Sequence, residues 1–204
     1  DTLNPEKYKK ITGRDAFARV WDSVIKAMAA GFSPVKLNMV AMRGVNDDEF
    51  LDFARLSKDR PLHVRFIEHM PIGDQTVDAN REILSREIKK CISESEELIS
   101  LGPVGDTTAE RFALKGAAGE VGFISPISKH FCAACNRLRL TADGRLLSCL
   151  LSNRFCDIKK PLRDKASDED LVEIIRQAVQ NKPGFSGDAP RRDGALPRKM
   201  SAIG

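Results

Sequence analysis

The stretch VKLNMVAMRGVNDDEFLDFARLSKDRPLHVRFI, residues 35–67, decides the fold. Residues 35–42 alternate apolar and polar side chains, which is typical of a half-buried strand. A helix is predicted at about residues 47–58, and a second strand follows at 62–67. A strand, a helix and a strand joined by short links predict a parallel α/β arrangement, a slice of a barrel or of a doubly wound sheet.

Three polar residues interrupt the apolar pattern of these two strands: Lys36, Asn38 and Arg65. In a closed barrel they would point into the lumen, where a buried charge needs a partner. The alternative is a lysine on a solvated edge strand. In such barrels the chemistry lies at the carboxyl ends of the strands. Met70 follows the end of the second strand, where it either contacts a ligand or fills the core.

The rest of the chain first continues this pattern and then changes to short strands. Asp15 is predicted to cap a helix that ends near Gly31. Its buried face is predicted to comprise Phe17, Val20, Trp21, Val24, Ile25 and Met28. Further elements are predicted as a helix at about 80–92, strands at 110–115 and 120–127, a hairpin of 137–141 with 145–149, and a helix capped by Ser167 and Asp170.

Three cysteines in the run HFCAACNRLRLTADGRLLSCL, residues 130–150, predict a metal site. Cys132, Cys135 and Cys149 are spaced C-x2-C-x13-C, and the predicted hairpin brings the two ends of this run together. Three thiolates without an obvious fourth ligand suit an iron–sulfur cluster with one open iron. They also suit a Cys3His zinc site if His130 joins them.

Arg137 and Arg139 share one face of the strand between these cysteines. They could clamp an anion with paired hydrogen bonds, balance the charge of the thiolates, or form a solvated face. Cys91 lies on an apolar helix face and is expected in the core, and Cys156 is not expected to be a ligand.

Composition narrows the class of protein. The 204 residues are 42% hydrophobic and 30% charged, with a net charge of +4 and five cysteines. We therefore expect a cytoplasmic globular protein without a membrane partner. The mild positive charge permits an anionic partner but does not demand one, and no nucleic-acid partner is expected. The Walker A, G-x-G-x-x-G and zinc deaminase motifs are absent from the sequence. The basic tail ends at Gly204 and is either disordered or threads into a cavity.

Five segments resemble the GTP 3′,8-cyclases, a family of radical S-adenosylmethionine enzymes of molybdenum cofactor biosynthesis. They are DTLNPEKYKKITG, VKLNMVAMRGVND, VRFIEHMPIG, HFCAACNRLRLTADGRLLSCL and the ending MSAIG. The resemblance implies the carboxyl-terminal two thirds of such a protein. It implies the last α/β units of an incomplete (β/α)6 barrel at residues 1–72. At residues 73–204 it implies an α+β extension with a second iron–sulfur cluster, GTP-binding residues and the basic tail.

The resemblance also implies the roles of individual residues. Cys132, Cys135 and Cys149 would hold a second 4Fe–4S cluster whose open iron binds the guanine of GTP. Met70 would contact S-adenosylmethionine, and Gly204 would end a tail that enters the site, although the family typically ends in two glycines. Residues implied to contact GTP are Lys36, Arg65, Arg137, Leu138 and Arg139.

The implied reaction converts GTP to 3′,8-cyclo-7,8-dihydro-GTP through a 5′-deoxyadenosyl radical. The C-x3-C-x2-C motif of the first 4Fe–4S cluster, which cleaves S-adenosylmethionine, is absent from this sequence, so we expect the chain to be inactive alone. The full-length family member is expected to be a homodimer that feeds a downstream pyranopterin synthase. Two alternatives stay open: another radical enzyme with an auxiliary cluster, and a non-enzymatic Cys3His zinc module that binds RNA.

Overall fold

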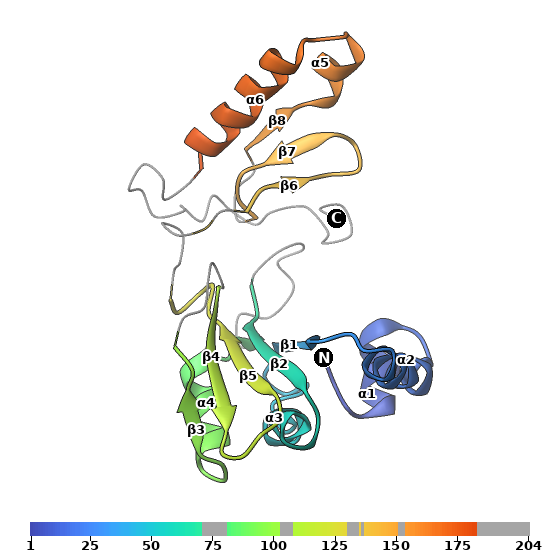
Figure 1. Ribbon diagram of the computed structural model, residues 1–204, viewed down its shortest axis with the longest axis vertical. Coiled ribbons are helices and arrows are strands. Elements are labelled where there is room, and N and C mark those ends of the chain that lie inside the picture. The colour runs from blue at the N-terminus through green and yellow to red at the C-terminus, as the bar shows by residue number, and fades with distance from the viewer. Residues whose placement is uncertain (71–80, 103–107, 130–134, 136, 151–153, 183–204) are drawn as a thin grey trace. The chain divides into compact units, whose positions relative to one another are not determined.

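A computed structural model describes residues 1–70, 81–102, 108–129, 135, 137–150 and 154–182. The described residues up to 129 form one compact unit, and those from 135 to 182 form a second (Figure 1). Residues 81–129 belong to the same compact unit as residues 1–70.

The first unit is built on a five-stranded sheet in the order β1-β2-β5-β4-β3. β1 pairs with β2, and β2 with β5, in parallel, whereas β4 and β3 are antiparallel additions. The strands are β1 (Val35–Ala41), β2 (Leu62–Glu68), β3 (Leu98–Ser100), β4 (Ala109–Leu114) and β5 (Glu120–Ile124).

Two helices, α3 (Phe50–Asp59) and α4 (Ser85–Ser93), cover one face of this sheet (Figure 1). The core lies between them and the sheet, because alternate residues of each strand point to this face. Three aromatic rings form its centre: Phe66 lies 5.7 Å from both Phe50 and Phe123, measured between ring centroids. The predicted strand–helix–strand unit is confirmed, and so is the coarse α/β class.

A buried carboxylate closes the carboxyl end of β2. Glu68 is fully buried and accepts hydrogen bonds from the backbone N–H groups of Ser85, Ile127 and Ser128 at 2.8, 3.0 and 2.8 Å. The hydroxyl of Ser128 also donates to it. Glu68 therefore ties the end of β2 to the start of α4 and to the segment after β5.

The first two helices differ from the prediction. An unpredicted helix, α1 (Pro5–Thr12), begins at the cap residue Asn4. The next helix, α2 (Phe17–Ala29), has no side-chain cap, because its cap residue is Ala16; the predicted cap, Asp15, pairs with Lys9 at 3.4 Å. The predicted buried face of α2 is also wrong: no residue of this helix is buried, since its main neighbours are α1 and β1.

The second unit has a three-stranded antiparallel sheet in the order β6-β7-β8, with α6 packed against β7 and β8. The predicted hairpin and its turn are confirmed, and Gly144 donates to Thr141 O at 2.9 Å. The capping box of Ser167 and Asp170 is confirmed too. The elements are β6 (Arg139–Leu140), β7 (Arg145–Leu147), β8 (Phe155–Asp157), α5 (Lys159–Arg163) and α6 (Asp168–Gln180). Among the described residues, none of the helices has the length and apolarity needed to cross a bilayer.

Candidate functional site

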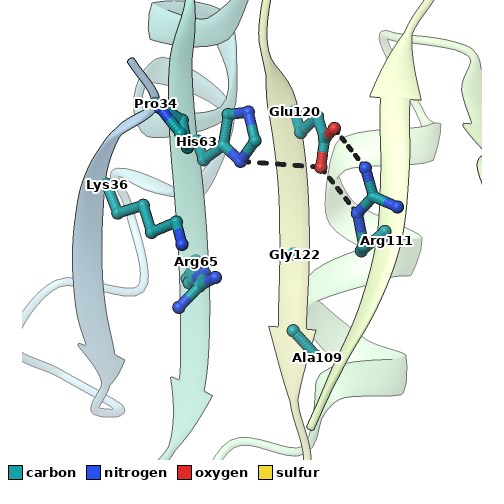
Figure 2. A pocket seen from close by; sticks show the side chains of 8 residues that line it. All are labelled: Pro34, Lys36, His63, Arg65, Ala109, Arg111, Glu120 and Gly122. Carbon is teal, nitrogen blue, oxygen red and sulfur yellow. Dashed lines mark hydrogen bonds and ion pairs between the residues drawn. The ribbon is translucent and has the colours of Figure 1, made fainter. Parts of the chain in front are cut away.

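The face of the first sheet opposite the core carries a row of charged side chains (Figure 2). Lys36 of β1 pairs in register with His63 of β2, and Arg65 of β2 lies two residues further along. Neither Lys36 nor Arg65 makes a hydrogen bond or an ion pair with a described residue. Arg65 does interact electrostatically with His63 and Glu120 at longer range. The structure thus brings together two of the predicted GTP contacts, on neighbouring strands.

Two further residues extend this row: Glu120 on β5 and Arg111 on β4. Arg111 Nε donates to Glu120 Oε2 at 2.8 Å, and a second guanidinium nitrogen reaches the other carboxylate oxygen. Glu120 Oε2 also lies 3.6 Å from Nδ1 of His63 (Figure 2). These three side chains are only 20–25% exposed, so their interactions are partly shielded from water.

Electrostatics make this surface attractive to anions. Burial lowers the pKa of His63; Lys36, Arg65 and Arg111 lower it further, and the attraction of Glu120 only partly opposes them. The hydrogen bonds from Arg111 lower the pKa of Glu120 below its usual value despite partial burial. At neutral pH one carboxylate therefore faces three cationic side chains.

These residues line a pocket of about 110 Å³, together with Pro34, Ala109 and Gly122. The pocket is small and cationic, so it suits a phosphate-sized group. The pocket lies towards the amino-terminal half of β2, which ends at Glu68. Arg65 is three residues before this end, which corresponds to about 10 Å at a rise of about 3.3 Å per residue.

The second candidate site lies at one end of the β6–β7 hairpin. Arg139 pairs with Leu147, so the segments that precede β6 and follow β7 emerge at the same end. Cys135 is on the first segment and Cys149 on the second, and both are half-buried. Cys132 and His130 lie outside the described residues.

Cys135 has surroundings that favour a thiolate. Burial alone would raise its pKa, but hydrogen bonds from the Arg137 backbone and from Lys182 outweigh burial, so the pKa of Cys135 is lowered. The Nζ atom of Lys182 lies 3.3 Å from Cys135 Sγ. Thiolates are the ligands of zinc and of iron–sulfur clusters, and N–H donors to sulfur are common around such clusters. The surroundings of Cys135 therefore suit a metal-bound thiolate, and among the described residues no group of three His, Cys, Asp or Glu side chains is placed to hold a metal ion.

The remaining predicted contacts fall in different places. Arg137 is exposed, whereas Leu138 and Arg139 are half-buried at the start of β6. Met70 is half-buried just after β2, and Gly204 lies outside the described residues.

Sequence reasoning does not single out Arg111, Glu120, Glu68 or Lys182. The alternation of β2 places His63 beside Arg65, and this is a usable signal. The position of β5 beside β2 is not apparent in the sequence, and Lys182 has no motif at all.

The fold and the site together define a class of protein. The family model of the radical SAM superfamily matches residues 1–57. The model described as Molybdenum Cofactor Synthesis C matches residues 62–185, more than half of the chain. The chain belongs to this molybdenum cofactor synthesis family.

Its relatives confirm the resemblance to GTP 3′,8-cyclases. The chain is 46% identical to GTP 3′,8-cyclase of Moorella thermoacetica, over 100% of its own length and 63% of that protein. It is 46% identical to GTP 3′,8-cyclase of Desulforamulus reducens, over 90% of its length and 57% of that protein. Molybdenum cofactor biosynthesis protein 1 of Bos taurus is 42% identical over 89% of the chain and 29% of that protein. The chain therefore spans less than two thirds of the length of these relatives.

Proposed function

We propose that this chain is the GTP-binding part of a GTP 3′,8-cyclase, the enzyme that forms 3′,8-cyclo-7,8-dihydro-GTP. The observation that carries the proposal is the pair Lys36 and Arg65, adjacent cations on β1 and β2 that border a phosphate-sized pocket. The identity of the chain to enzymes of this name supports it along the whole sequence. Residues 1–72 would be the last units of an incomplete (β/α)6 barrel, and residues 73–204 the extension.

The sheet face would bind the triphosphate. A nucleoside triphosphate carries several negative charges, and charge-assisted hydrogen bonds from lysine and arginine are stronger than neutral ones. Arg137, Leu138 and Arg139 are further proposed contacts of GTP. Because Met70 follows the carboxyl end of β2, it would contact S-adenosylmethionine beyond the pocket, on the side where barrel enzymes do chemistry.

Cys132, Cys135 and Cys149 would hold a 4Fe–4S cluster with one open iron. When bound, this cluster would supply a Lewis-acidic iron for the guanine ring. The radical would come from S-adenosylmethionine and a first cluster on a C-x3-C-x2-C motif that this sequence lacks. The residues of this chain would hold the nucleotide so that ribose C3′ and guanine C8 lie close together. Proximity of this kind favours ring closure over side reactions.

The proposal also includes the oligomeric state of the enzyme, its downstream partner and its tail. A cytoplasmic homodimer would pass its product to a pyranopterin synthase, and the tail that ends at Gly204 would enter the site. The chain by itself would bind GTP without cyclising it.

Metal content tests the proposal directly. We expect the anaerobically purified chain to be brown and to carry about four irons, as a cubane cluster requires. Addition of GTP should change its visible spectrum or its electron paramagnetic resonance, because guanine would bind at the open iron. A colourless chain with one zinc would overturn the proposal in favour of a structural Cys3His module. A brown chain whose spectra do not change with GTP would agree with the proposed cluster but would contradict GTP as its ligand.

A further inference from the structure

The second unit contains a buried lysine that no motif predicts. Lys182 directly follows α6 and its cap residue Asn181, and it is only 6% exposed. Burial of an ammonium group is unfavourable unless its donors are satisfied. The partners of Lys182 must therefore account for its position.

All three ammonium donors are accounted for within one short segment. Lys182 Nζ donates to Cys135 O at 2.7 Å, to Arg137 O at 2.8 Å and to Cys135 Sγ at 3.3 Å. An ammonium group has three N–H donors, so this set satisfies it completely. The two carbonyl contacts hold the backbone on both sides of residue 136, and the third contact reaches the thiol itself.

The position of Lys182 depends on how α6 is held. The capping box at Ser167 fixes its first turn, and Ala178 is buried where α6 packs against β7 and β8. The backbone N–H of Lys182 donates to Val179 O at 3.1 Å, which extends the last turn of the helix. The negative end of the helix dipole also favours a cation at this point.

We infer that Lys182 is a positioning residue for the cluster ligand Cys135, and that its cationic N–H···S contact stabilises the reduced form of the cluster. This inference rests on the proposed function, in which Cys135 is a ligand. A clamp of purely structural purpose would need only the two carbonyls. Hydrogen bonds to cluster sulfurs are among the features that set cluster reduction potentials, and outer contacts of this kind govern metal retention.

The test compares variants of the anaerobically reconstituted chain. Lys182→Met removes the charge but keeps the length of the side chain, and Lys182→Arg keeps the charge. Lys160→Met is the matched control, because Lys160 is exposed on α5 of the same unit. The readouts are the iron content, the rate of iron loss to a ferrous chelator, and the midpoint potential from a redox titration followed by electron paramagnetic resonance.

We expect Lys182→Met to lose iron several-fold faster and to have a more negative midpoint potential. Lys182→Arg and Lys160→Met should stay close to the wild-type chain. If Lys182→Met does not fold, Lys182→Gln, which keeps a neutral donor, replaces it, and its potential should lie below that of Lys182→Arg. Equal potentials with iron bound would overturn this inference alone. A wild-type chain without iron would overturn it together with the proposed function.

Discussion

Glu120 lies between two basic side chains: it accepts a 2.8 Å hydrogen bond from Arg111 on β4, and it lies 3.6 Å from His63 on β2. Parallel pairing of β5 with β2 makes this arrangement possible, because it sets His63 and Glu120 opposite each other in register. Glu120 thereby orients Arg111 and partly neutralises a surface that otherwise carries only positive charge.

The pKa of His63 should report on Glu120. Because the carboxylate opposes the lowering of this pKa by burial and by neighbouring cations, Glu120→Gln should lower it further. Titration of the imidazole by nuclear magnetic resonance measures this directly. Glu97→Gln is the control, since Glu97 is exposed and pairs with Lys115 at 3.0 Å. An unchanged or raised pKa in Glu120→Gln would contradict the assigned contact.

The same histidine should make folding pH-dependent. Its pKa is lowered in the folded state, so the unfolded chain binds a proton first as the pH falls. Its contribution to stability is therefore present above about pH 6.5, the unfolded value, and is lost below it. Urea unfolding between pH 7 and pH 5 should show a decline that is smaller in His63→Gln. A decline of equal size in both chains would exclude His63 as its source.

Loss of either cation at the pocket should weaken GTP binding. Lys36→Met and Arg65→Met each remove charge-assisted contacts worth about 1.5–3 kcal/mol, which corresponds to a roughly tenfold to hundredfold higher Kd. Calorimetric titration should show a smaller loss for GMP than for GTP, because GMP has fewer phosphates. Lys26→Met is the control, since Lys26 pairs with Asp22 at 2.7 Å on the exposed helix α2. Equal losses for the two nucleotides would place the base, not the phosphates, at this pocket.

Substitution of Cys149 and of Cys156 should have different effects on the iron content. Cys149 follows β7 at the end of the hairpin, whereas Cys156 pairs in register with Leu146 inside the sheet. Cys149→Ser should reduce the iron content from about four per chain to near zero, and Cys156→Ser should retain it. Iron analysis and visible absorption of both reconstituted variants measure this. Loss of iron in Cys156→Ser would identify Cys156 as a ligand.

The sequence predicts local elements well and their partners poorly. The strand–helix–strand segment of β1, α3 and β2 is predictable, because the alternation of apolar and polar residues and the short connections are local signals. Pairing of β5 with β2 joins residues far apart in the chain, so Glu120 and Arg111 could not be assigned to the same surface as Lys36.

The remaining differences have separate causes. The helix α1 has a recognisable start, Asn4 followed by Pro5, but its sequence has little apolar periodicity. The apolar stripe of α2 predicts burial, yet a stripe cannot reveal whether a neighbour covers it. Cys135 and Cys149 are predictable from spacing alone, whereas Lys182 is placed by the packing of α6 and not by any pattern.

Removal of the Glu68 carboxylate should destabilise the first unit. The carboxylate of Glu68 accepts four hydrogen bonds, whereas the NH2 group of a glutamine would itself face hydrogen-bond donors. We therefore expect Glu68→Gln to lower the free energy of unfolding by about 3 kcal/mol. Burial would raise the pKa of Glu68, but these hydrogen bonds lower it overall. Its stabilisation is therefore present above about pH 4.3, the unfolded value, and disappears as the pH falls through the folded pKa.

Urea unfolding of wild type and Glu68→Gln at several pH values tests this, and the difference should narrow in acid. Glu94→Gln is the control, because Glu94 is exposed at the end of α4 and should change stability by less than about 0.5 kcal/mol. A difference between wild type and Glu68→Gln that persists in acid would mean that shape, not charge, makes Glu68 important.

Two glycines of the β4–β5 turn should respond differently to alanine. A Cβ atom at Gly119 would lie 2.1 Å from Leu62 O, on the backbone that begins β2. At Gly116 nothing lies within 4 Å of such an atom, and the cost there comes from its positive φ of +74°. We expect Gly119→Ala to cost about 3 kcal/mol through overpacking, and Gly116→Ala about 1 kcal/mol through backbone strain.

Urea unfolding measures both costs, and the pKa of His63 gives an independent readout. The N–H of Gly119 donates to Ser57 O of α3 at 2.8 Å, and Glu120, the next residue, pairs with His63 of β2. Displacement of Gly119 should therefore move Glu120 away from His63. The pKa of His63 should then fall in Gly119→Ala, as in Glu120→Gln, and stay unchanged in Gly116→Ala. If the two alanine variants lost the same stability and left His63 unaffected, close packing at Gly119 would not be what positions Glu120.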